Sequence, residues 1–116
     1  MTGADPVDRG GGAARRVVAY VPDLMDRSRL ARLGEVEVVH VSGPAALVAV
    51  ATATDLVVVD LSREGVLEVV GSLPGEVVGF ASHVDTALVA AAEAAGCAEV
   101  LPRSRFFAGL AVRLSG

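Results

Sequence analysis

The chain has no lysine and no tryptophan, a single cysteine, and only 3% aromatic residues, and its net charge is −4. Because Cys97 has no second cysteine to pair with, an internal disulfide is excluded and a cysteine-based metal site is not expected. Scarce aromatic residues leave no stacking platform for single-stranded nucleic acid. The negative net charge gives no general attraction to nucleic acid or to an anionic membrane surface. The composition therefore predicts a protein without nucleic-acid or membrane partners.

Long hydrophobic runs are also missing. No apolar stretch approaches the roughly 20 residues that a membrane-spanning helix needs. The N-terminus is polar and rich in glycine and lacks the apolar centre of a signal peptide. These features predict a cytoplasmic protein. We expect residues 1–15 to form a disordered tail and residues 16–116 to form one domain.

What the sequence does contain is a regular alternation of apolar runs and helical patterns, within a composition that is 53% hydrophobic. The expected strands cover residues 17–21, 36–41, 55–60, 76–81 and 98–101. The expected helices cover residues 24–33, 44–53, 64–73, 85–95 and 104–114. The strands are solid apolar runs, which indicates a parallel sheet buried on both faces. The predicted fold is therefore α/β: a single doubly wound, five-stranded parallel sheet of flavodoxin-like (βα)5 type, with helices on both faces.

In such a sheet, ligands bind beyond the carboxyl ends of the strands. The polar and turn residues expected there are Pro22, Asp23, Asp26, Ser42, Asp60, Ser62, Ala81, Ser82, His83, Pro102 and Arg103. The glycine run at residues 10–12 precedes the first strand, so it does not form a dinucleotide-binding fingerprint. The serine in GFASHVD lacks the second glycine of a hydrolase nucleophile elbow. A small flavodoxin-like enzyme or ligand-binding domain stays open as an alternative, without a positive motif.

The order of these elements resembles the receiver domain of response regulators. The similarity runs through VVAYVPDLMDRSRLARL, through EVEVVHVSGPAALVAVATATDLVVVDLS, and through EVVGFASHVDTALVAAAEAAGCAEVLPRS, and covers residues 16 to 114. The resemblance implies that Asp60, at the end of the third strand, is the candidate phosphoacceptor. It also implies that Asp23, together with Asp60, is a candidate Mg²⁺ ligand. Ser82 and Arg103 are the candidate phosphate or switch contacts.

The sequence departs from the receiver pattern at several of these positions. Pro22 replaces one of the two acids that follow the first strand, and Ala81 occupies the position of the hydroxyl residue, with Ser82 one residue later. Arg103 stands where receivers have lysine, and Val100 replaces the switch aromatic. Guanidinium is larger and planar, and it can bind a carboxylate in a bidentate manner. These departures predict an Arg103–Asp60 pair that closes the pocket without phosphate.

Three readings follow from this comparison. The preferred one is a divergent, stand-alone receiver-like signalling domain, or pseudo-receiver, that acts by protein–protein interaction and has no enzymatic activity or cofactor. The first alternative is a receiver that is phosphorylated on Asp60 with Mg²⁺. The second is the small enzyme or ligand-binding domain described above.

The resemblance also implies a partner surface. In receivers, the fourth helix, fifth strand and fifth helix often form a dimer face. The sequence places its alanine-rich fourth helix and an aromatic pair in the fifth helix there. The candidate dimer-face residues are Leu88, Ala92, Phe106, Phe107 and Leu110, and a weak or moderate homodimer is the expected assembly.

Overall fold

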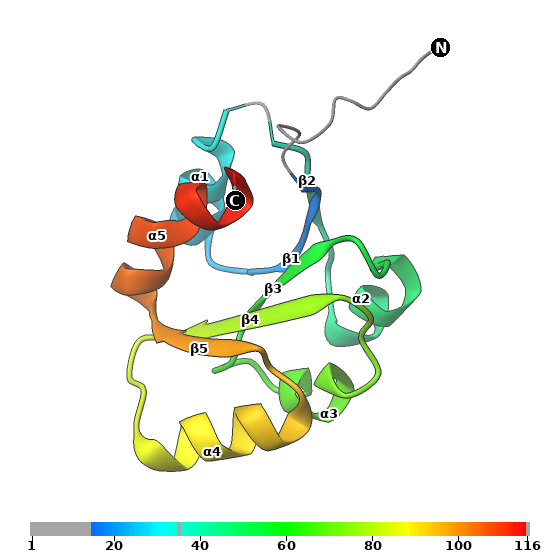
Figure 1. The fold of residues 1–116 in the computed structure, drawn as a ribbon, viewed down its shortest axis with the longest axis vertical. Helices are drawn as coiled ribbons and strands as arrows, with labels where there is room; N and C mark the ends of the chain where they lie inside the picture. Colours follow the sequence, from blue (N-terminus) through cyan, green and yellow to red (C-terminus); the bar gives the residue numbers. More distant parts are fainter. Residues whose placement is uncertain (1–14, 35, 116) are drawn as a thin grey trace.

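The structure, a computed structural model, describes residues 15–34 and 36–115, with side chains as far as residue 110. Strands and helices alternate along the chain (Figure 1). The strands are β1 (Val17–Tyr20), β2 (Val38–His40), β3 (Leu56–Asp60), β4 (Glu76–Ala81) and β5 (Glu99–Pro102). The helices are α1 (Leu24–Ala31), α2 (Pro44–Val50), α3 (Val66–Val70), α4 (Thr86–Ala95) and α5 (Arg103–Ser115). Residues 1–14, which carry nearly all of the predicted tail, lie outside the described residues.

The sheet is parallel throughout and has the strand order β2-β1-β3-β4-β5. The predicted doubly wound α/β fold is confirmed. Helices α1 and α5 cover one face of the sheet, and α2, α3 and α4 cover the other (Figure 1). The strand order changes direction between β1 and β3, so the carboxyl ends of these two strands define the crevice in which polar side chains can meet.

Strand β3 lies at the centre of the core, and all five of its residues are buried. Val57 and Val59 pack toward α2, α3 and α4, whereas Leu56 and Val58 pack toward α1 and α5. This two-sided burial explains why the strand reads as a continuous apolar run. It also delivers Asp60, the last residue of β3, to the carboxyl edge while keeping it buried.

The helix boundaries follow local backbone chemistry. Asp85 caps α4 by accepting a hydrogen bond from the amide of Leu88, and Gly96 ends the helix at φ 124°. Three helices are shorter than predicted by more than one residue, and the first of them, α1, ends at Ala31 instead of Leu33. Helix α2 ends at Val50 because the backbone of Ala51 is extended. Helix α3 starts only after Gly65, whose φ of 86° is left-handed and interrupts the helical backbone.

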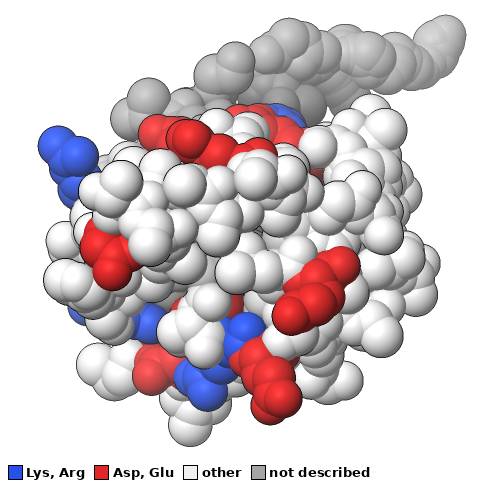
Figure 2. Space-filling view, turned by 90° about the horizontal axis from the view of Figure 1, so that it is seen from below, with Lys and Arg blue, Asp and Glu red and all other residues white. Residues whose placement is uncertain are grey.

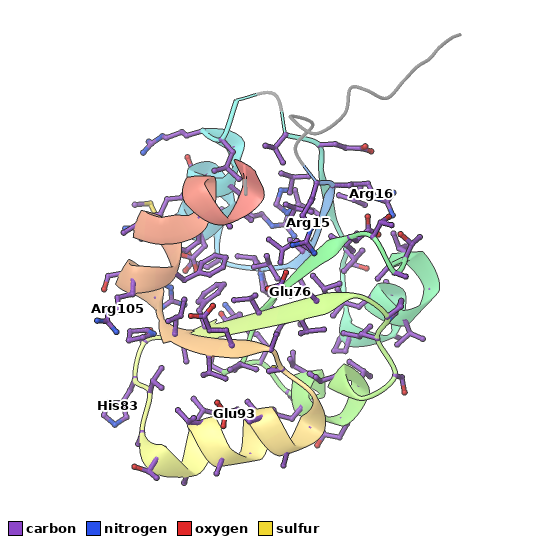
Figure 3. All side chains as sticks on the ribbon, viewed as in Figure 1. Arg15, Arg16, Glu76, His83, Glu93 and Arg105 are labelled. Carbon is purple, nitrogen blue, oxygen red and sulfur yellow. The ribbon has the colours of Figure 1, made fainter. Side chains whose placement is uncertain are left out.

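The amino edge of the sheet is held by two ion pairs. The guanidinium of Arg16 donates to both carboxylate oxygens of Asp55, at 2.9 and 2.7 Å. The same carboxylate accepts from the amide and the hydroxyl of Thr52, at 2.8 and 3.1 Å. Arg15 pairs with Glu76 at 2.6 Å, and Figure 3 shows Arg15, Arg16 and Glu76 together at this edge. No helix in the described segments combines the length and the apolar character needed to cross a membrane.

Candidate functional site

Asp60 is fully buried, and each of its two carboxylate oxygens has partners. Oδ1 accepts hydrogen bonds from the amide and the hydroxyl of Ser62, at 3.0 and 2.6 Å. Oδ2 faces two guanidinium groups, those of Arg63 at 3.4 Å and Arg103 at 3.5 Å. The strand therefore positions this carboxylate at the carboxyl edge, and the following turn and two arginines surround it.

Asp23 and Asp26 both follow β1, but they have different roles. Asp23 is the N-cap of α1, and its Oδ1 accepts from the amides of Met25 and Asp26 at 2.8 and 3.0 Å. The hydrogen bond from Asp26, then that from Met25 and the charge of Arg103, lower the pKa of Asp23 below its usual value. Asp26 lies one turn into the helix and is only 2% exposed. The second buried carboxylate of the site is thus Asp26 rather than Asp23.

Arg103 connects the polar residues at this edge. Its Nε donates to Oδ2 of Asp26 at 3.0 Å, and its Nη2 lies 3.5 Å from Oδ2 of Asp60. Its Nη1 donates to the hydroxyl of Ser82. The guanidinium also lies over the ring of Phe80, 5.2 Å from the centroid. One side chain at the start of α5 therefore links α1, β3 and the loop after β4.

The predicted Arg103–Asp60 pair is present in the structure, but it is the longer of the two ion pairs that Arg103 forms. The shorter one joins Arg103 to Asp26, which the sequence placed at this edge without assigning it a role. Asp26 precedes the buried Leu30 by four residues, so both lie on the inner face of α1. This spacing is the sequence signal that could have identified Asp26 as the buried carboxylate and Asp23 as the helix cap.

The donor set can be compared with the needs of Mg²⁺, which takes several oxygen ligands in near-octahedral geometry. Oδ1 of Asp23 is used by helix amides, and Oδ2 of Asp26 and of Asp60 face the Arg103 guanidinium. A fixed cation thus occupies the position between the carboxylates. Among residues 15–34 and 36–115, no three His, Cys, Asp or Glu side chains form a cluster that could hold a metal. This arrangement does not fit the ion.

The predicted dimer face needs correction. Ala92 is fully buried, and Phe106 and Leu110 are each 1% exposed, because they pack against the sheet. The five residues also belong to opposite faces. Leu88 and Ala92 contact the core beneath α2, α3 and α4, whereas the residues from α5 contact the core beneath α1. Only Leu88 and Phe107 keep partial exposure.

Comparison with known proteins gives matches at the level of structure. No protein-family model and no curated protein sequence matches the chain. The crystal structure of a response regulator from Hahella chejuensis has a TM-score of 0.74 at 19% sequence identity, over 88% of this chain and 93% of that chain. The signal receiver domain of NarL, assigned as a response regulator, from Mycobacterium tuberculosis has a TM-score of 0.70 at 23% identity. It covers 89% of this chain and 98% of that chain. With its five-stranded parallel sheet and its carboxylates at the carboxyl edge, the chain has the fold of a response-regulator receiver domain.

Proposed function

We propose that the chain is a receiver-like signalling domain that acts through protein contacts and does not use conventional phosphorylation of Asp60. One observation carries the proposal: the guanidinium of Arg103 is paired with the two buried carboxylates of this edge, Asp26 and Asp60, and with the hydroxyl of Ser82. No catalytic activity and no cofactor are part of the proposal.

The physical argument concerns charge. A carboxylate that attacks a phosphoryl group needs a divalent cation to offset the negative charge on both reactants. In this chain the Arg103 guanidinium already lies against the two aspartates and offsets their charge. A phosphoryl group on Asp60 would add negative charge beside Asp26, and Arg103 would have to offset that charge while it is already paired with Asp26 at 3.0 Å. Leaving a buried carboxylate unpaired is costly.

The alternative, a receiver phosphorylated on Asp60, is supported by the position of that residue at the end of β3, near the hydroxyl of Ser62. Incubation with acetyl phosphate and Mg²⁺, followed by intact-mass measurement, separates the two functions. We expect the wild-type chain to gain no phosphoryl group. An adduct that forms on the wild type and is lost in Asp60→Asn would establish the alternative and overturn the proposal.

Replacing Arg103 tests its role as the internal counter-charge. Arg103→Ala leaves two buried carboxylates without their shared partner, so we expect unfolding free energy to fall by about 3 kcal/mol. Arg105→Ala is the matched control, because Arg105 is exposed and lies on the same helix (Figure 3). Its effect should stay within about 0.5 kcal/mol. Equal stability of the two variants in urea denaturation would contradict the role assigned to Arg103.

The protein contact that we propose first is with a second copy of the chain, through the face made by α4, β5 and α5. Residues Ala87, Ala90, Ala91 and Ala94 are exposed along α4, and Glu93 is its only charged residue. Figure 2 views the side of the molecule on which α4 lies and shows mainly uncharged side chains between scattered acidic and basic groups. Small side chains allow a partner helix to approach closely. These exposed alanines replace the buried residues in the predicted face.

A further inference from the structure

A groove between α1 and α5 lies on the opposite face of the sheet from α4 and has a volume of about 390 Å³. Its apolar lining comes from Leu33, Phe107, Ala108 and Leu110. The ring of Phe107 is held in place by edge contacts with Phe106 and Phe80, at centroid distances of 4.9 and 5.5 Å. The groove therefore has a preformed apolar floor of the size that small-molecule sites have, about 300–1,000 Å³.

Polar groups are restricted to three of the lining residues. Arg29, Arg32 and Ser104 complete the lining, and all three are exposed. The guanidinium of Arg29 lies 5.3 Å from the centre of the Phe107 ring, so one positive charge is placed directly beside the apolar floor.

Among the described residues, no carboxylate balances the charge of these two arginines. In the described part of the chain, ion pairs with carboxylates are formed by Arg15, Arg16, Arg63 and Arg103. Neither Arg29 nor Arg32 has a carboxylate within ion-pair distance there. The chain as a whole carries a net charge of −4, so an apolar groove with two guanidinium groups that no described carboxylate pairs differs from the average surface.

We propose that this groove binds a small amphipathic anion, in which one carboxylate is joined to an apolar chain. The apolar chain would lie against Leu33, Phe107 and Ala108, and the carboxylate would accept hydrogen bonds from Arg29 and Arg32. Guanidinium groups suit this task because they bind carboxylates in a fork geometry and are less strongly hydrated than an ammonium group.

The dimensions favour a small molecule over a protein partner. Among the side chains that the structure describes, the lining from α5 spans residues 104 to 110, which is about 9 Å of helix at 1.5 Å per residue. A stable protein interface uses roughly 20–30 residues on each side. A second copy docked symmetrically on this groove would also bring Arg29 and Arg32 close to their own equivalents, and like charges would repel.

Titration of the ¹⁵N-labelled full chain with decanoate tests the site. We expect saturable amide shifts that centre on Leu33 and Ala108. In the double variant Arg29→Gln/Arg32→Gln, affinity should fall about tenfold or more, because both charge-assisted hydrogen bonds are lost. The matched control, Arg105→Gln, removes one exposed arginine from outside the groove lining and should bind decanoate as the wild type does.

Decyltrimethylammonium, with the same apolar chain and the opposite charge, should produce no saturable shifts in the groove. Equal binding of the two amphiphiles, equal affinity of the double variant, or shifts centred elsewhere would each overturn the proposal. A helical peptide with one leucine face and one glutamate face serves as a further probe. If this peptide saturates the groove and decanoate causes no shifts, the groove binds a protein partner instead of a small ligand. That result would also overturn the proposal.

Discussion

Arg103 shows how one side chain can determine the chemistry of a sheet edge. At the start of α5 this chain has a planar cation with several donors, and these donors reach Asp26, Asp60 and Ser82. A lysine has a single charged nitrogen and could not make these contacts in the same geometry. The Arg103 guanidinium therefore couples α1, β3 and the loop after β4.

Asp55 makes a comparable set of contacts at the amino edge. Hydrogen bonds from the Arg16 guanidinium, followed by those from Thr52, lower the pKa of Asp55 to about 2, against the desolvation that raises it. Its folded-state pKa is therefore below the value of about 3.9 expected in the unfolded chain. The carboxylate contributes its full stability above about pH 4 and loses it as the pH falls toward 2.

Asp55→Asn should lower the unfolding free energy at pH 7 by about 2 kcal/mol, because the charge on the Arg16 contact is lost. Urea denaturation of wild type and variant at pH 7, 5 and 3 measures the difference. We expect the difference to be similar at pH 7 and 5 and smaller at pH 3. Glu64→Gln, at an exposed position, controls for the loss of one negative charge. If the difference in unfolding free energy between wild type and Asp55→Asn is as large at pH 3 as at pH 7, the Arg16–Asp55 ion pair is not its source.

At the scale of the elements, the end of β3 is held by a close contact with β4. A Cβ atom on Gly79 would lie 2.6 Å from the side chain of Leu61, which directly follows Asp60. The amide of Leu61 also donates to the carbonyl of Phe80 at 2.8 Å. Gly79 thus leaves room for the side chain of Leu61, and Leu61 fixes the position of the chain directly after Asp60.

Gly79→Ala should destabilise the protein by about 1–3 kcal/mol, because Leu61 is buried and must shift. Combining it with Leu61→Ala should cost less than the sum of the two single changes, since the clash is removed. Thermal or urea unfolding measures these differences. Gly109→Ala, in helix α5, is the opposite-sign control: outside its own helix backbone, its Cβ would meet no described atom within 4 Å. We expect that variant to gain up to about 1 kcal/mol. Additive costs in the double variant would contradict the contact.

The positions of the strands and helices could be predicted from the sequence where the pattern of buried side chains determines them. The solid run at residues 55–60 predicts β3 because a strand covered on both faces needs an apolar side chain at every position. The ends of α2 and α3 were not predictable from apolar spacing, since they depend on the backbone angles of Ala51 and Gly65. Asp60 could be placed because it ends a strand. The role of Asp26 depends on which side of α1 faces the sheet, which apolar spacing did not reveal. The dimer-face residues were predicted wrongly because the side of α4 and of α5 that faces the sheet was also not identified.

At the scale of the whole molecule, the proposed homodimer is a test of the exposed face of α4. Ala91→Arg places a long charged side chain where helices would approach, so we expect the dimer dissociation constant to rise about tenfold or more. Ala91→Ser is the matched control, because it keeps the small volume. Sedimentation velocity over a range of concentrations measures both. A wild-type chain that stays monomeric at every concentration would contradict the dimer.

The positive charge between Asp26 and Asp60 is covalently part of the chain, and this has a consequence for signalling under the proposed function. A chelator cannot remove it, a phosphatase cannot reverse it, and dilution cannot release it. Under the proposed function no reversible mark is made on Asp60, so a stimulus would have to reach the domain through the binding of a partner or a ligand.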